Sequence, residues 1–443
     1  MEPSEKIHDY ANVVCGEIQW EKAHAVVSEE IENHLADQRD AYMADGADEL
    51  AATDKAIAQM GDPIAVGIQL DRTHRPQPQW GMLAFAAIFI CTGIVLNISG
   101  NWGFGYGWML YLFIQLASGL AAMAAAFFFD FTWTGRYPRI LLPLLMALFA
   151  AGIVISEAVG YSFLWEYNSL TLLLPLGFAG LVYSLRNKGA LSILFSTAVV
   201  LIPVLLPFIA EVRWLRAQSV LYSLAAVVIL CAAVSRGWFR ISKRSGYWLV
   251  FLPFAVVLIT ALLIMAGNGR LDRIWNTFHL PYRGDGTYGW EGYFTETQAM
   301  LAGSKFIGHG VMPNGSAFSS GGGGLLTGWV FDSGWITVIP VFALLLLFFV
   351  TGFRLCFRQK SVLGLLVSVS VMTTLAMQIV CAVLHDFGIY LLSGLPLPLV
   401  FSSSPEFVVD MALAGLMLSV FRTGDVVRDR TIKKKRFVDA ARV

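Results

Sequence analysis

The chain changes character near residue 79, where mixed polar and apolar positions give way to long apolar runs that begin at Trp80. A helix needs about 20 apolar residues to cross a bilayer. Runs of about this length predict transmembrane helices at residues 80–99, 107–129, 138–159, 168–185, 190–210, 219–236, 247–267, 325–350, 362–384 and 406–421. The expected fold is all-α: a polytopic membrane helix bundle of about ten transmembrane helices behind a small helical cytosolic domain.

Residues 1–78 predict this compact, acidic N-terminal domain. Apolar residues recur with helical periodicity from Glu17 to Met43, and a second helix is expected from Asp48 to Met60. Glycines at 46 and 61 end these helices, and a Pro-rich linker at residues 74–78 leads to the membrane domain at residues 79–443. The candidate buried stripe of the first helix consists of Ile18, Ala25, Val26, Ile31 and Leu35.

Composition supports this division. The 443 residues are 56% hydrophobic and 14% charged, whereas soluble domains carry about 25% charged residues. Residues 1–78 hold 6 basic and 16 acidic residues, and the remainder holds 25 and 15. No signal peptide is expected, because the first 78 residues are polar. The histidines and cysteines show no metal-ligand spacing, so no metal is expected. The chain has no Walker motif and no nucleic-acid-binding patch, so no cofactor and no nucleic-acid partner are expected.

Basic residues alternate between the connections and predict the orientation. Cytosolic loops of membrane proteins are rich in Lys and Arg. The connections near residues 100–106, 160–167 and 385–405 carry neither residue. The intervening connections carry Arg136, Arg139, Arg186, Lys188, Arg236, Arg240, Lys243, Arg244, Arg354, Arg358 and Lys360, and the C-terminal tail is basic as well. A multi-pass protein of the cell membrane with both termini in the cytoplasm is predicted.

Two segments expected outside break this rule. The turn near residues 211–218 holds Arg213 and Arg216, and the large outer loop at residues 268–324 holds Arg270 and Arg273 near its start. Such residues could meet a phosphate of a lipid headgroup. The alternative is that long loops escape the positive-inside rule, which is a fair account of the second segment.

Part of the N-terminal domain resembles a known module. The segments Glu29–His34, Ala56–Pro63 and His74–Pro76 are similar to the short helical prefix domain that precedes some Gram-positive permeases. The similarity indicates the kind of domain and carries no chemistry of its own.

The last third of the chain contains a proline-rich stretch, Ser393–Leu399, and an apolar stretch that ends in serine and arginine, Ala414–Arg422. These segments resemble the signature and the final helix of the SEDS family, the RodA-, FtsW- and SpoVE-type membrane proteins of cell-wall synthesis. In the large loop, the family's lead-in is matched by Tyr293, Gln298, Gly308 and Gly310, and Asp332–Trp335 matches the following helix start. Pro396 and Pro398 bar a regular helix, so residues 388–405 are expected to be a re-entrant or surface-lying segment that roofs a cavity.

The resemblance implies a function in peptidoglycan synthesis, cell shape or division. SEDS proteins are glycosyltransferases that polymerise lipid II, a polyprenyl-pyrophosphate-linked glycan precursor, and a class B penicillin-binding protein is the implied partner. Substrate-binding residues are then expected among Arg213, Arg216, Arg270, Arg273, Tyr293, Gln298, Gly308, Gly310, Pro396 and Pro398.

The sequence departs from the family at the position of the expected catalytic carboxylate. The sugar hydroxyl requires a base, and the family's aspartate falls on Gly323 here. The weak candidates for a replacement are Asp332, Glu296 and Asp285, while Asp386 is expected to be a solvated loop acid. Asp410 stands where the family has Asn, and we expect it to form a hydrogen bond within the bundle.

Three functions therefore remain open. The chain could be a glycosyltransferase, or a non-catalytic SEDS relative that binds lipid or regulates a partner. It could also be a lipid flippase or transporter, because about ten spans with buried acids suit transport too. A carboxylate and two or more arginines that converge on one outward cavity would favour the enzyme.

Overall fold

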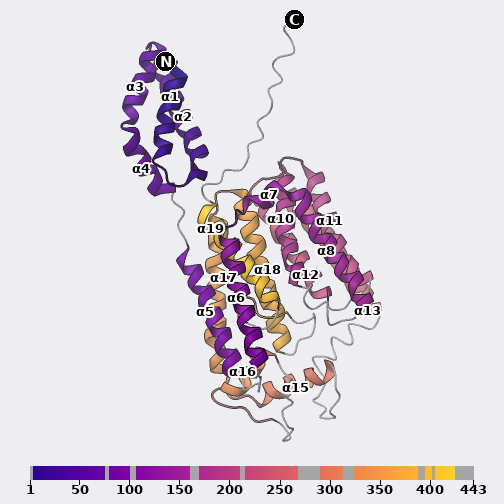
Figure 1. The fold of residues 1–443 in the computed structure, drawn as a ribbon. Helices are drawn as coiled ribbons and strands as arrows, with labels where there is room; N and C mark the ends of the chain where they lie inside the picture. The colour runs from indigo at the N-terminus through magenta and orange to yellow at the C-terminus, as the bar shows by residue number, and fades with distance from the viewer. Residues whose placement is uncertain are drawn as a thin grey trace. The chain divides into compact units, whose positions relative to one another are not determined.

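The structure, a computed structural model, describes residues 3–74, 79–99, 106–159, 169–209, 215–267, 290–312, 324–387, 395–401 and 405–424. Every regular element within these ranges is a helix (Figure 1). The chain divides into two compact units, Met1–Pro78 with Arg422–Val443, and Gln79–Phe421.

The first unit contains four helices, α1 (Pro3–Gly16), α2 (Glu21–Ala44), α3 (Glu49–Met60) and α4 (Pro63–His74). Helix α1 packs against the other three, and α2 packs against α3. Fully buried apolar side chains from α1, α2 and α3 form the core. The buried row of α2 is Ala23, Val27, Ile31 and Leu35.

The sequence prediction for this unit was partly correct. Helices α2 and α3 lie where two helices were expected, whereas α1 and α4 were not predicted. Ile18, Ile31 and Leu35 are buried as expected. Ala25 is exposed and Val26 half-buried, because the buried row follows a spacing of four residues from Ala23.

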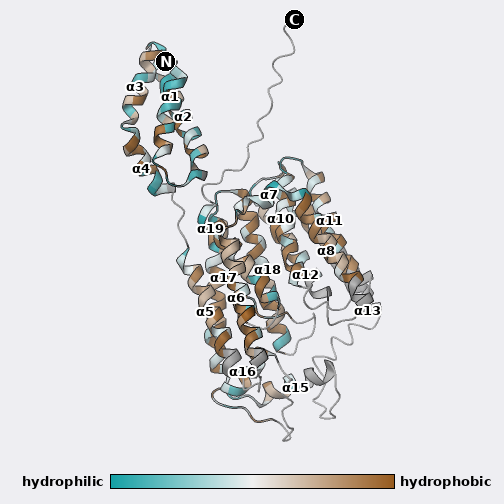
Figure 2. Cartoon of the chain, in the orientation of Figure 1, coloured by the Kyte–Doolittle hydropathy of each residue, from teal (hydrophilic) through white to brown (hydrophobic). Residues whose placement is uncertain are grey.

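The second unit holds the apolar helices, along which hydrophobic residues predominate (Figure 2). Its elements are α5 (Trp80–Ser99), α6 (Tyr106–Phe128), α7 (Thr132–Arg136), α8 (Pro138–Val159), η1 (Ser169–Leu173), α10 (Leu174–Ser184), α11 (Ala190–Ile209), α12 (Leu215–Ser235), α13 (Lys243–Gly267), α15 (Trp290–Gly303), α16 (Leu325–Ser333), η3 (Trp335–Thr337), α17 (Val338–Arg358), α18 (Val362–Asp386) and α19 (Pro405–Thr423).

Each predicted apolar segment coincides with helix, with one difference. The segment expected at residues 325–350 is broken at Gly334 into α16 and α17, and α17 continues to Arg358. Gly334 has φ +95°, and a Cβ there would lie 2.6 Å from the carbonyl oxygen of Phe306, so this sharp turn requires glycine. Among the described residues, three helices are long and apolar enough to cross a membrane, at Met109–Phe128, Trp335–Arg358 and Val362–Asp386. The count of ten spans stays a prediction.

Helix α18 is the central element of this unit. It packs against α10, α12 and α17, and almost every residue from Leu363 to Leu375 is buried. Close backbone contacts bring further elements together: a Cβ at Gly415 of α19 would overlap the carbonyl of Met123 in α6, and one at Gly93 of α5 would overlap the backbone of Phe401. Glycine at these positions allows two backbones to touch.

Candidate functional site

The site is built around α16, whose first turn is held by the end of α18. Oδ2 of Asp386 accepts a hydrogen bond of 3.0 Å from the backbone nitrogen of Leu326, and the hydroxyl of Thr327 donates to the carbonyl oxygen of Asp386. A Cβ on Gly324 would overlap the Asp386 carboxylate. A carboxylate is favourable at a helix start, where backbone N–H groups lack partners within the helix. Asp386 therefore caps α16 from a different helix.

The other end of α16 is enclosed by residues 303–312. Backbone nitrogens of Gly308 and Gly310 donate to the carbonyls of Ser333 and Phe331, at 3.1 and 2.7 Å. Gly308 has φ +88°, and a Cβ on Gly310 would lie 2.7 Å from the Phe331 ring. These two glycines, expected to bind substrate, have a packing role here, and their contact with a ligand stays a prediction.

Asp332 is exposed at the end of α16. Its Oδ1 lies 3.4 Å from Nδ1 of His309, and the two side chains are 63% and 67% exposed. The His309 ring also meets the Phe331 ring edge-on, at 5.0 Å between centroids. An exposed ion pair contributes little to stability, so these two groups are free to meet a polar ligand.

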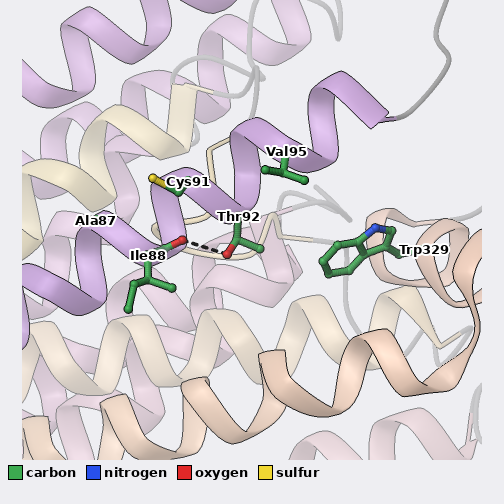
Figure 3. Close-up of a pocket in the computed structure, with 6 residues that line it drawn as sticks. All are labelled: Ala87, Ile88, Cys91, Thr92, Val95 and Trp329. Carbon is green, nitrogen blue, oxygen red and sulfur yellow. Dashed lines mark hydrogen bonds between the residues drawn. The ribbon is translucent and has the colours of Figure 1, made fainter.

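An apolar pocket opens between α5 and α16 (Figure 3). Its volume is about 370 Å³, and its lining is Ala87, Ile88, Cys91, Thr92 and Val95 of α5 with Trp329 of α16. The Thr92 hydroxyl donates to the carbonyl of Ile88 within its own helix, at 2.8 Å, which leaves the lining almost entirely apolar. Trp329 precedes Asp332 by three residues, and residues at this spacing are neighbours on a helix surface.

The proline-containing segment is described from Leu395 to Phe401 and is not helical. Pro398 is buried and Pro396 half-buried, and Leu399 has φ +63°. Phe401 packs on the ring of Phe407 in α19, with 5.3 Å between centroids. The irregular backbone expected from the two prolines is present, buried in the bundle. Residues 388–394 and 402–404 lie outside the described residues.

The remaining predicted residues fall as follows. Glu296 and Gln298 are half-buried on α15. The lining of the described pocket contains neither a carboxylate nor an arginine. Outside the described residues lie Arg213, Arg270, Arg273, Asp285 and Gly323, together with the side chains of Arg216 and Tyr293.

Two features of the site were missed from the sequence. Asp386, expected to be solvated, is buried because it binds α16 sixty residues earlier in the chain. Trp329 forms one wall of the pocket but lies within an apolar run, where nothing distinguishes it from a core residue. The glycine run that ends at Gly324 was the only hint of the Asp386 contact. Glycine permits a close approach of another residue, but the sequence does not show which residue approaches.

Comparisons with known proteins identify the fold. The sequence matches no family model and no curated protein. A chain of a peptidoglycan synthase complex that coordinates polymerization and crosslinking aligns with 78% of this chain and 98% of its own length, at 18% identity and a TM-score of 0.55. Two crystal structures of the rod shape determining protein RodA from Thermus thermophilus, native and point mutant, align at 16% identity with 78% of this chain and 97% and 98% of theirs, each with a TM-score of 0.46.

The chain therefore has the all-helical membrane fold of the synthase chain. The all-α membrane helix bundle that the sequence predicted is therefore confirmed.

Proposed function

We propose that the chain is a SEDS-type protein of peptidoglycan synthesis that binds a polyprenyl-pyrophosphate-linked glycan precursor beside α16. One observation carries this proposal: the apolar pocket at Trp329 lies one helical turn from the exposed Asp332–His309 pair. Such a precursor is amphiphilic, with a long isoprenoid chain on a polar pyrophosphoryl sugar. The fold and the sequence motifs support the same class of function.

The two halves of the ligand would meet different chemistry. The pocket, at about 370 Å³, lies within the usual range for small-molecule sites and suits several isoprene units. The Asp332 carboxylate suits sugar hydroxyls, and it would repel a pyrophosphate. The pyrophosphate requires cations, and the proposed donors are Arg213, Arg216, Arg270 and Arg273, placed by the topology prediction on the outer side.

We propose binding without efficient polymerisation. Gly323 stands at the family's base position. The Asp332 side chain is 63% exposed, so the protein does not hold its carboxylate in one orientation, as a general base requires. The synthase chain of similar fold belongs to a complex for polymerization and crosslinking. By this analogy, a class B penicillin-binding protein is the proposed partner, with this chain as its lipid-binding or regulatory subunit.

A pocket-filling substitution tests the proposal. Ile88→Trp fills the pocket, and the matched control Ile202→Trp alters an exposed isoleucine on α11. Excluding two methylenes of the ligand costs about 1.6 kcal/mol, so lipid II should bind Ile88→Trp about tenfold more weakly. Binding of fluorescent lipid II to purified protein in nanodiscs measures this. Equal affinity in both variants would reject the pocket as the lipid site.

The arginines are tested separately. Loss of one desolvated contact between a cation and phosphate should cost about 1.5–3 kcal/mol. The variant with alanine at Arg213, Arg216, Arg270 and Arg273 should therefore lose lipid II binding while it keeps affinity for an uncharged polyprenol. Unchanged binding of lipid II would reject these residues as its headgroup site.

A further inference from the structure

A buried polar pair joins α18 to α19, eight residues before Asp386 along α18. Nε2 of Gln378 donates a 3.0 Å hydrogen bond to Oδ1 of Asp410, which confirms the hydrogen bond expected of Asp410. Gln378 is 0% exposed and Asp410 1% exposed. The carboxyl group is thus enclosed in an apolar bundle, where an ionised acid is costly unless it is neutralised.

The remaining two oxygens of this pair have no hydrogen-bond donor. Oε1 of Gln378 and Oδ2 of Asp410 are both buried without a partner. An ionised carboxylate and an amide oxygen can only accept, so neither can satisfy the other. One proton on Oδ2 removes the conflict, because the resulting O–H can donate to Oε1. The amide and the carboxylic acid then form two complementary hydrogen bonds.

Among the described residues, the elements around Asp410 place no basic side chain within one helical turn of Asp410 or Gln378. The contacts of α19 place α6, α18 and residues 395–401 against it. The titratable or charged residues on these elements and on α19 are Tyr106, Tyr111, Cys381, His385, Asp386, Glu406 and Arg422. His385 lies about two helical turns from Gln378, and Arg422 lies about three turns from Asp410.

Glu406 is the closest of these along the chain, one helical turn before Asp410 and 2% exposed. Its charge and that of Asp410 oppose each other when both are ionised. Glu406 follows Pro405, the first residue of α19. The amide of Gln378, which can pair with a carboxylic acid, is hydrogen-bonded to Asp410, so Asp410 is the carboxyl to carry the proton.

We propose that Gln378 and Asp410 form a buried proton-binding site, in which Asp410 holds one proton at neutral pH and donates it in a hydrogen bond to Gln378. Glu406 is the adjacent group through which this proton can be exchanged. The ligand of the site is a single proton, and its uptake neutralises the carboxyl that is hydrogen-bonded to Gln378.

Infrared spectroscopy of the full-length protein in detergent at pH 7 tests the proposal. A protonated carboxyl has a C=O stretch apart from those of carboxylates and amides. Wild-type protein should show this band, and Asp410→Asn should lose it. The band should persist in Glu406→Gln and shift in Gln378→Leu, where the acceptor is gone. Absence of the band from wild-type protein, or its loss in Glu406→Gln alone, would overturn the assignment.

Thermal unfolding supplies a second measurement. Asn at position 410 imitates a neutral acid, since its amide can pair with Gln378. At pH 5 the unfolding midpoint of Asp410→Asn should stay within about 3 °C of wild type. Because unfolding releases the proton of Asp410, the wild-type midpoint should fall as the pH rises from 5 to 9, and it should fall less in Asp410→Asn. A large fall in the midpoint with unchanged pH dependence would show that the charge of Asp410 is required, and would reject the proton site.

Discussion

Asp386 and Leu326 are sixty residues apart in the chain, yet the carboxylate of the first accepts a 3.0 Å hydrogen bond from the backbone nitrogen of the second. The contact fixes the start of α16 to the end of α18. It also leaves no space for a side chain at Gly324. The start of α16, which leads to the pocket wall at Trp329, is therefore held by this carboxylate, while residues 303–312 hold its other end.

Removal of this cap should destabilise the protein. Asp386→Ala leaves the buried N–H of Leu326 without an acceptor, and we expect a loss of about 1–3 kcal/mol in the free energy of unfolding. Asp386→Asn retains an acceptor oxygen and should cost less. Asp332→Ala, at the exposed end of the same helix, should change stability by no more than about 0.5 kcal/mol. Thermal unfolding in detergent measures all three, and an equal effect of Ala at 386 and 332 would contradict the capping role.

Glycan polymerisation should be weak or absent. A positioned base contributes about 10²–10⁴ in rate, and position 323 offers none. Purified protein incubated with lipid II, alone and with a class B penicillin-binding protein, should yield few chains on a gel. Robust chains that vanish in Asp332→Asn or Glu296→Gln would identify a relocated base. Chains that survive every such substitution would show that the chemistry does not depend on these carboxylates.

Both termini should lie in the cytosol. The prediction is based on the basic residues, which occur in every second connection between the predicted helices, as expected of cytosolic loops. Single cysteines introduced at residues 104, 290 and 392, with the native cysteines replaced, should react with an impermeant maleimide added to intact cells. Cysteines near either terminus should react only after lysis. The reverse result at any of the three positions would refute the topology.

The N-terminal unit should fold by itself. Residues 1–78 contain α1–α4 with their own apolar core, so the isolated fragment should show a helical circular dichroism spectrum. A random-coil spectrum would count against an independent domain.

Cys15 reports on the same fold. Burial, with a smaller contribution from Glu32, raises the pKa of the Cys15 thiol. Only the thiolate is nucleophilic, so Cys15 in the native fragment at pH 8 should be alkylated more slowly than in the urea-unfolded fragment. The rise of the alkylation rate with pH should also occur at a higher pH in the native fragment than in the unfolded one. Equal rates in the two states would mean that Cys15 is exposed.

The helices of the membrane unit could be predicted because their apolar runs are long, and each coincides with a helical segment. The break at Gly334 could not, since it depends on the carbonyl of Phe306 lying 2.6 Å from where a Cβ would stand. In the N-terminal unit, α1 and α4 were missed although neither is shorter than α3, which was predicted. Helices of this length are marginal alone, and α1 packs against the other three helices, so tertiary packing decides their formation.

The site was less predictable than the fold for a physical reason. Asp386 and Trp329 acquire their roles from residues far away in the sequence, on α16 and α5 respectively. A lone acid next to His385 gives no sign that it will cap another helix. Asp410 differed, because an acid within an apolar run must find a buried partner, and Gln378 is that partner.

The break at Gly334 determines which parts of the molecule can move together. Helices α16 and α17 are adjacent in sequence, but the first turn of α16 is attached to Asp386 at the end of α18, and Phe387 stacks on Trp335 just beyond the break, at 5.7 Å between ring centroids. A tilt of α18 would therefore carry the first turn of α16 with it and bend the chain at Gly334. Since α5 forms the opposite wall of the pocket, the width of this pocket would follow the angle between α18 and α5.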